Sequence, residues 1–108
     1  MARTKIVCVD TSRDVLAYLN ALLKRSGYEV FTTRVLEDAM TLVYSQMPHM
    51  VICGPGMLGL PDGEAAVEKF RDSKPRIPVL LLPPDFSAAD AGQAGVELVD
   101  RVRSLLGD

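Results

Sequence analysis

The chain has 108 residues, of which 48% are hydrophobic and 24% are charged, a composition typical of an ordinary soluble globular domain. This length can build one hydrophobic core but not two, so residues 1–108 are expected to form a single domain. A formal net charge of −2 gives no basic surface for nucleic acid or for an anionic membrane. No apolar run approaches the roughly 20 residues of a membrane span and no signal-peptide core follows the start, so we expect a cytoplasmic protein.

The first half of the chain alternates strand-like and helix-like segments. Residues 5–9, KIVCV, form a continuous β-branched run typical of a parallel strand buried on both faces. A capping-box-like start at residues 11–14, followed by apolar residues at helical spacing up to Gly27, predicts the first helix. The alternation over residues 28–32 predicts a second strand, and residues 36–47 predict a second amphipathic helix.

The second half continues this alternation. Residues 50–53 predict a third strand, which leads into a loop rich in glycine and proline. A third helix is predicted between Gly63 and Pro75, a fourth strand over residues 79–82, and a final helix over residues 96–106. Strands that alternate with helices in this way predict a parallel sheet with helices on both faces.

The connection before the final helix is too short for the regular alternation. Only the 13 residues PPDFSAADAGQAG separate Leu82 from Val96, too few for a helix and a further strand together. We therefore expect a helix to be reduced or lost here, while the strand after it either survives as a short strand or is lost too. The sheet would then expose apolar surface that a partner could bury, and Phe86 would either anchor that partner or fold back to plug the gap.

Several segments in this order and spacing resemble the receiver domain of two-component response regulators, the CheY-like family. The matching segments are KIVCVD, LLKRSGYEV, EDAMTLV, PHMVICG, DGEAAVEKFR and RIPVLLL. The resemblance implies an α/β, flavodoxin-like, doubly wound parallel sheet with strand order 2-1-3-4-5. In this chain the fourth helix of the family would be the element reduced or lost, and its fifth strand would either survive as a short strand or be lost too.

The resemblance also implies a phosphorylation pocket, in which an acidic pair holds Mg²⁺, an aspartate accepts the phosphoryl group, and a hydroxyl and a lysine bind it. The corresponding positions in this chain are Asp10 and Thr11 for the acidic pair, Gly54 for the acceptor and Pro83 for the hydroxyl. The last lysine, Lys74, precedes the fourth strand, so the lysine position is empty as well. The chain therefore resembles a degenerate pseudo-receiver that is not an enzyme and holds no cofactor, with at most weak Mg²⁺ binding at Asp10.

Alternatives remain open for the individual residues of this pocket. Asp10 could cap the following helix or bond the neighbouring loop. Either Asp62 or Asp10 could serve as a displaced phosphoacceptor. The glycines of the loop 54–59 could fill a closed pocket as tight turns with positive φ, or their backbone N–H groups could bind a small anion.

The resemblance implies a protein partner: a kinase, an output domain, a second receiver or a second copy of this chain as a homodimer. Neither nucleic acid nor a membrane is expected as a partner of this domain, which could be the N-terminal part of a longer regulator. The candidate interaction surface consists of Pro84, Phe86, Val96, Val99 and Arg103.

Three further side chains carry reactive groups. Cys8 and Cys53 lie in apolar runs and are expected to be buried and reduced. A redox pair would require both thiols to point to the same side of the sheet. His49, the only histidine, is expected on the surface and not in a catalytic role.

Overall fold

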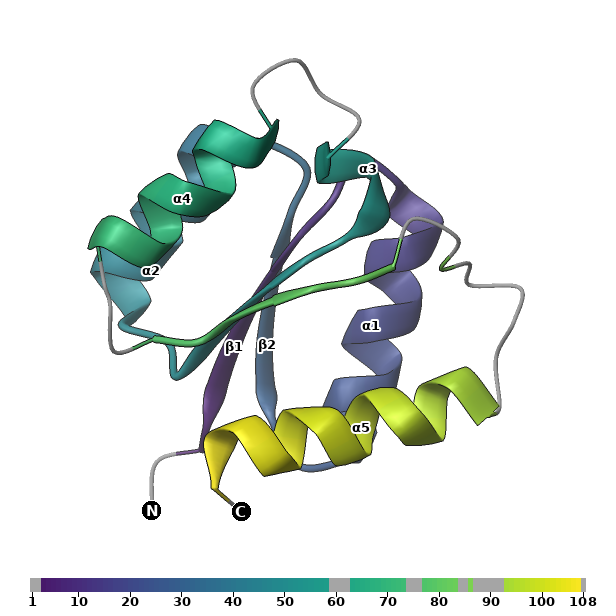
Figure 1. Ribbon diagram of the computed structural model, residues 1–108. Coiled ribbons are helices and arrows are strands. Elements are labelled where there is room, and N and C mark those ends of the chain that lie inside the picture. The colour runs from purple at the N-terminus through teal and green to yellow at the C-terminus, as the bar shows by residue number, and fades with distance from the viewer. Residues whose placement is uncertain (1–2, 59–62, 74–76, 84–85, 87–92, 108) are drawn as a thin grey trace.

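A parallel sheet forms the centre of the computed structural model, which describes residues 3–58, 63–73, 77–83, 86 and 93–107. The sheet has four parallel strands in the order β2-β1-β3-β4 (Figure 1). The strands are β1 (Lys5–Val9), β2 (Glu29–Thr33), β3 (Met50–Cys53) and β4 (Val79–Leu81).

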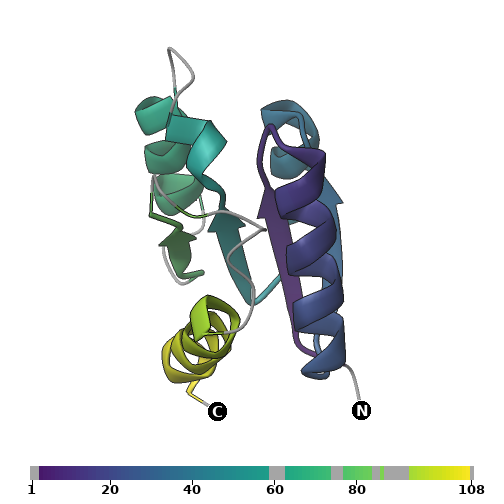
Figure 2. The ribbon, with the colours of Figure 1, turned by 90° about the vertical axis from the view of Figure 1, so that its right-hand side faces the viewer.

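Helices cover both faces of this sheet. Helices α1 (Arg13–Arg25) and α5 (Gln93–Leu106) lie on one face, and α2 (Leu36–Gln46) and α4 (Gly63–Ser73) lie on the other (Figures 1 and 2). A short helix, α3 (Pro55–Leu58), follows β3 directly. Among the described residues, no helix is long and apolar enough to cross a membrane.

The predicted alternation of strands and helices is confirmed, with differences at two helices. Helix α3 lies in the loop rich in glycine and proline, where no helix was predicted. Helix α5 begins at Gln93, three residues before the predicted start, and therefore contains Gly95. Gly95 is buried, and a Cβ atom there would collide with the Tyr18 hydroxyl of α1. A glycine that looks like a helix breaker thus allows α5 to pack closely on α1.

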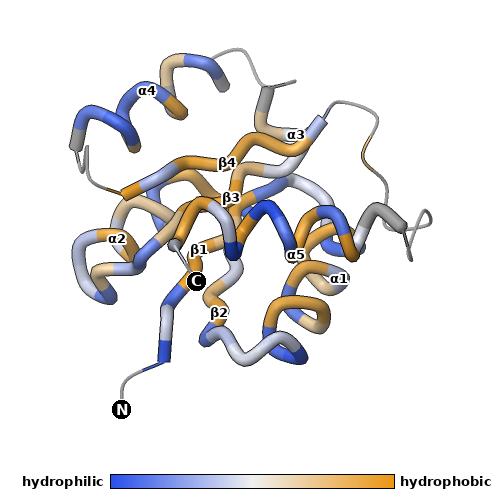
Figure 3. The backbone as a smooth tube through the Cα atoms, turned by 60° about the horizontal axis from the view of Figure 1, so that its bottom comes forward, coloured by the Kyte–Doolittle hydropathy of each residue, from blue (hydrophilic) through white to orange (hydrophobic). Residues whose placement is uncertain are grey.

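The strands divide the core into two clusters because successive side chains point to opposite faces of a sheet. In β1, Ile6 and Cys8 pack with α1 and α5, whereas Val7 and Val9 pack with α2 and α4. All four side chains are fully buried, as expected for the apolar run KIVCV, and the strands form the hydrophobic centre of the molecule (Figure 3).

This division also separates the two cysteines. Cys8 belongs to the cluster under α1 and α5, and Cys53 belongs to the cluster under α2 and α4. The thiols therefore point to opposite faces of the sheet, and the hypothesis of a redox pair is wrong. Both cysteines are free and buried. Burial raises the pKa of each thiol, that of Cys53 from 9.0 to about 12.

Strand β4 is the last strand of the sheet on its side among the described residues. The predicted order 2-1-3-4-5 agrees with this sheet as far as β4. Residues 84–85 and 87–92, where the reduced fourth helix and fifth strand were expected, lie outside the described residues.

Candidate functional site

The carboxyl ends of β1 and β3 meet at one edge of the sheet, where parallel α/β proteins usually bind their ligands. Asp10 follows β1, and Gly54 follows β3. The backbone N–H of Gly54 donates a hydrogen bond of 2.9 Å to the carbonyl oxygen of Val9. This bond extends the sheet by one position and places the two residues of interest side by side.

The Asp10 side chain is turned into the protein. It is fully buried, and each of its carboxylate oxygens accepts a hydrogen bond from a backbone N–H group. Oδ1 accepts from Gly56, in α3, at 2.8 Å, and Oδ2 accepts from Ser12 at 3.2 Å. The cap of α1 is Ser12, whose hydroxyl accepts from the Val15 N–H. Asp10 thus accepts hydrogen bonds from α3 and from the turn before α1. The side chain that caps α1 is that of Ser12 and not that of Asp10.

Gly54 has no room for a side chain because Asp10 occupies that space. A Cβ atom at Gly54 would lie 2.6 Å from Oδ1 of Asp10, closer than real Cβ contacts allow. A Cβ atom at Gly56 would lie 2.8 Å from the same oxygen and would collide with the hydroxyl of Thr11. The absence of a side chain at Gly54 and Gly56 is therefore a packing requirement.

The prediction that loop glycines adopt positive φ is wrong for these two residues. Among the glycines that the structure describes, only Gly27 and Gly107 have positive φ. Gly59 lies outside the described residues.

The other pocket positions supply no charged group. Thr11 is half-buried, and its backbone carbonyl oxygen accepts a hydrogen bond of 3.0 Å from Nε of Arg34. Pro83 is exposed and follows Leu82, whose N–H donates to the carbonyl oxygen of Cys53. A proline offers neither a hydroxyl nor a backbone N–H at this position.

The remaining residues do not fit the Mg²⁺ ion that such a pocket usually binds. Mg²⁺ prefers carboxylate oxygens and water in an octahedral shell. The one carboxylate here, that of Asp10, is fully buried and already accepts two backbone hydrogen bonds. The described residues contain no group of three or more histidine, cysteine, aspartate or glutamate side chains that could hold a metal.

Comparison with known proteins identifies the family. The response regulator receiver domain family matches residues 6–102. The chain belongs to this family. Receiver domains function in two-component signalling, and the CheY-like fold expected from the sequence is confirmed.

A curated relative is the alkaline phosphatase synthesis transcriptional regulatory protein PhoP of Bacillus subtilis, 31% identical over 78 residues. That match covers 72% of this receiver domain and 32% of PhoP, so the chain spans about a third of that relative's length. The chemotaxis response regulator CheY4 of Vibrio cholerae has a similar structure, with a TM-score of 0.75 and 19% identity over 96% of this chain and 99% of CheY4.

A second similar structure is that of the response regulator TrrA, solved in complex with the histidine kinase ThkA. It has a TM-score of 0.74 and 23% identity, and the match covers 95% of this receiver domain and 98% of that chain. It shows a protein of this fold bound to a kinase.

The residues of the candidate interaction surface differ in exposure. Phe86 is half-buried, packs against the core under α1 and α5, and has its ring centroid 6.0 Å from that of Tyr18. On α5, Val96 is 59% exposed and Arg103 is exposed, whereas Val99 is only 9% exposed. Pro84 lies outside the described residues.

His49 stands apart from the pocket at Asp10 and Gly54. His49 is exposed, and its Nδ1 accepts a hydrogen bond from the backbone N–H of Lys5 at 3.1 Å. The alternative acceptor Asp62 lies outside the described residues.

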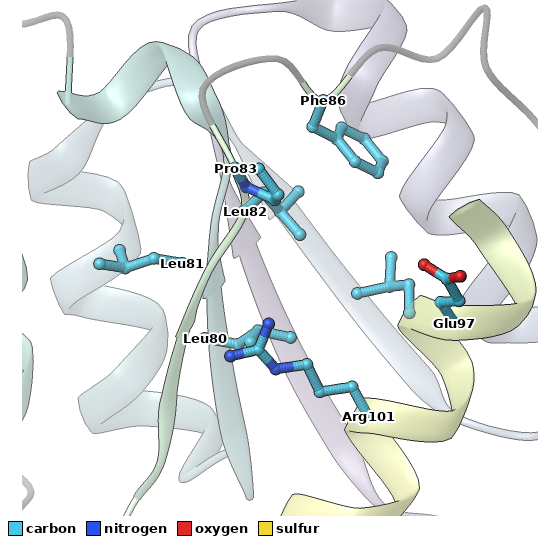
Figure 4. Close-up of a pocket in the computed structure, with 8 residues that line it drawn as sticks. Leu80, Leu81, Leu82, Pro83, Phe86, Glu97 and Arg101 are labelled. Carbon is cyan, nitrogen blue, oxygen red and sulfur yellow. The ribbon is translucent and has the colours of Figure 1, made fainter.

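Sequence reasoning missed a pocket between β4 and α5 of this receiver domain (Figure 4). Its volume is about 200 Å³. The lining residues are Leu80, Leu81, Leu82, Pro83, Phe86, Glu97, Leu98 and Arg101. The sequence signal for it was weak: Leu80 and Leu82 alternate with Leu81, but three leucines in a row also fit a strand covered on both faces.

Proposed function

We propose that this domain is a phosphorylation-independent pseudo-receiver that acts as a protein-interaction module in signal transduction or transcriptional regulation. One observation carries the proposal: the Asp10 carboxylate fills the space that an acceptor side chain at Gly54 would need. The pocket of this receiver domain is thus occupied by its own side chain.

The chemistry of phosphoryl transfer supports this proposal. An acyl phosphate forms only when a carboxylate oxygen attacks phosphorus in line with the leaving group, and a cation must neutralise the developing charge. Gly54 offers no oxygen. Asp10 would have to break two hydrogen bonds to backbone N–H groups and leave a fully buried position before it could attack.

Two alternatives have less support. A small-anion sensor would need free backbone N–H groups in the loop after β3. The N–H groups of Gly54, Gly56 and Met57 already donate to Val9, Asp10 and Gly54, and Pro55 has none. A displaced acceptor would require Asp62, because burial and hydrogen bonding hold Asp10 in place.

The proposal includes the setting of the domain. We place it in the cytoplasm, as a non-enzymatic part of a regulator whose partner is a kinase, an output domain or a second receiver. TrrA bound to its kinase and the longer regulator PhoP support such settings by analogy. We further propose that the fourth helix of the family is reduced or lost between Pro83 and Gln93.

Intact-mass spectrometry after incubation with acetyl phosphate and Mg²⁺ tests the proposal. We expect no phosphorylated species, while a receiver domain that retains its acceptor aspartate becomes labelled in the same tube. Stoichiometric labelling of this chain would contradict the proposal. If Asp62→Asn then abolished the label, the displaced acceptor would be the correct alternative.

A further inference from the structure

Within the part of the chain that the structure describes, the backbone of β4 pairs with another strand on one side only, that of β3. The N–H of Val51 donates to the carbonyl oxygen of Pro78 at 3.1 Å, and the N–H of Leu82 donates to that of Cys53 at 2.9 Å. In a parallel pair, these bonds direct the backbone groups of Leu80 toward β3 and those of Val79 and Leu81 away from it. No described strand pairs with that outer edge.

This edge lacks the features that usually protect an exposed strand. Natural edge strands carry charged side chains, prolines or bulges that discourage pairing with another chain. The three residues of β4 are Val79, Leu80 and Leu81, all apolar. Prolines stand only at its two ends, Pro78 and Pro83, so they limit the length of an added strand without preventing it.

The pocket between β4 and α5 lies beside this edge. Leu80 and Leu82 point toward α5, and Leu81 points to the opposite face (Figure 4). A strand added along β4 would place alternate side chains over the pocket. Leu82 and Leu98 give the pocket apolar walls, so the side chain that enters should be apolar as well.

The rim of the pocket carries charge. Arg101 extends from α5 toward Leu80, and Glu97 lies on the same helix nearer to Phe86 (Figure 4). Arg101 is exposed and forms no ion pair within the described ranges of the chain. A carboxylate on the added strand beside Leu80 would form the strongest hydrogen bonds with the Arg101 guanidinium. The positive charge of Arg101 therefore favours a partner segment with an acidic side chain.

We infer that the open edge of β4 binds an extended segment of a partner protein by strand addition, and that this segment carries an apolar and an acidic residue two positions apart, both facing α5. Main-chain hydrogen bonds to Val79 and Leu81 would hold the segment, while the pocket and Arg101 would select its side chains. The inference rests on the proposed role in protein binding. It does not depend on the loss of phosphorylation. If acetyl phosphate does not label the domain and no added strand binds to it, this inference is wrong and the proposed loss of phosphorylation still stands.

Amide hydrogen exchange of the free domain, followed by NMR, tests whether the edge is open. We expect rapid exchange at Val79 and Leu81 and slow exchange at Leu80, their internal control, whose N–H points toward β3. Slow exchange at all three residues in dilute protein would mean that the chain covers its own edge. Slow exchange only in concentrated protein would mean that a second copy covers it. Either result would overturn the inference.

Titration with the peptide acetyl-TITETVT-amide, whose Ile, Glu and Val share one face, then tests the partner chemistry. We expect saturable shifts at Leu80, Leu82 and Leu98, with slowed exchange at Val79 and Leu81. The peptide acetyl-TITKTVT-amide should bind more weakly. The acidic peptide N-methylated at its three central residues should not bind, because it lacks donors for strand pairing.

A pair of charge-reversal variants completes the test. Arg101→Glu should weaken binding of the acidic peptide about fivefold, the value of one peripheral ion pair. Lys24→Glu, a reversal of the same charge at an exposed position in the last turn of α1 and outside the pocket, should leave binding unchanged. If the acidic peptide does not bind at millimolar concentration, or if both variants weaken it equally, the inference is wrong.

Discussion

Asp10 and Gly54 share one space: the carboxylate of Asp10 lies where a side chain at Gly54 would begin, with Oδ1 2.6 Å from the Cβ position. The family resemblance alone gave two separate departures, an acidic pair reduced to one carboxylate and an acceptor replaced by glycine. The structure joins them, because the carboxylate that remains can turn inward only if residue 54 has no side chain. The two departures are therefore expected to depend on each other.

A double-mutant cycle measures this dependence. Gly54→Ala should lower the free energy of unfolding by about 2 kcal/mol, because the added methyl group collides with Asp10. In the Asp10→Ala background the same change should cost less than about 1 kcal/mol. Chemical denaturation gives both values. Gly27→Ala is the control for the effect of replacing a glycine by alanine without a collision. No atom lies within 4 Å of a Cβ atom at Gly27, and only its φ of +99° opposes a side chain. Equal costs of Gly54→Ala in both backgrounds would contradict the packing relationship.

Removal of the buried carboxylate should itself destabilise the domain. Asp10→Ala leaves the N–H groups of Gly56 and Ser12 without acceptors, and we expect a loss of about 2 to 4 kcal/mol. Asp10→Asn keeps an acceptor oxygen and should lose less. Mg²⁺ should not raise the melting temperature of the wild type. An Asp10→Ala variant that melts like the wild type, or a clear stabilisation by Mg²⁺, would instead indicate an open acidic pocket.

Phe86 should contribute to stability as a partial plug. Its ring is half-buried and packs on Tyr18 and the core under α1 and α5. Phe86→Ala should therefore cost about 2 kcal/mol, less than a fully buried phenylalanine. Phe86→Leu, which keeps most of the apolar volume, should cost less than half of that. Thermal melts that are unchanged in Phe86→Ala would assign the ring to a binding surface.

The buried thiols predict how stability depends on pH. Burial raises the pKa of Cys53 to about 12, with Arg71 lowering it and Asp10 raising it as smaller effects. An unfolded thiol ionises near pH 8.5, so above pH 9 the unfolded state loses protons that the folded state keeps. The free energy of unfolding should therefore fall as pH rises from about 9 to 11. It should fall less steeply in Cys53→Ala, and identical slopes would contradict this.

Much of the fold could be predicted from the sequence because periodicity and end signals agreed along the chain. The buried run KIVCV, the cap before α1 and the stop at Gly27 all marked real elements. The start of α5 could not be predicted, because Gly95 resembles a helix breaker until the Tyr18 hydroxyl is seen against it.

The candidate site was predictable in its residues and not in its arrangement. The sequence places Asp10 and Gly54 at the ends of two strands, and the resemblance implies which group of a phosphorylation pocket each position would hold. That Asp10 turns inward depends on the Gly56 N–H, which only the unpredicted helix α3 brings within 2.8 Å. The pocket beside β4 was missed for a similar reason, since it depends on where α5 lies relative to the sheet.

The most direct measurement of the central claim is an amide NMR titration with beryllofluoride and Mg²⁺, which together mimic a phosphorylated aspartate in a receiver pocket. The spectra should remain unchanged around residues 54–58 and at Asp10, because Gly54 has no carboxylate to bind beryllium and the Asp10 carboxylate is buried and hydrogen-bonded to two backbone N–H groups. Gly54→Asp alone should also fail to respond, because its new carboxylate would face Asp10 without a lysine or a hydroxyl. Saturable shifts in the wild type, centred on residues 54–58, would show that the pocket still accepts a phosphoryl group and would contradict the account.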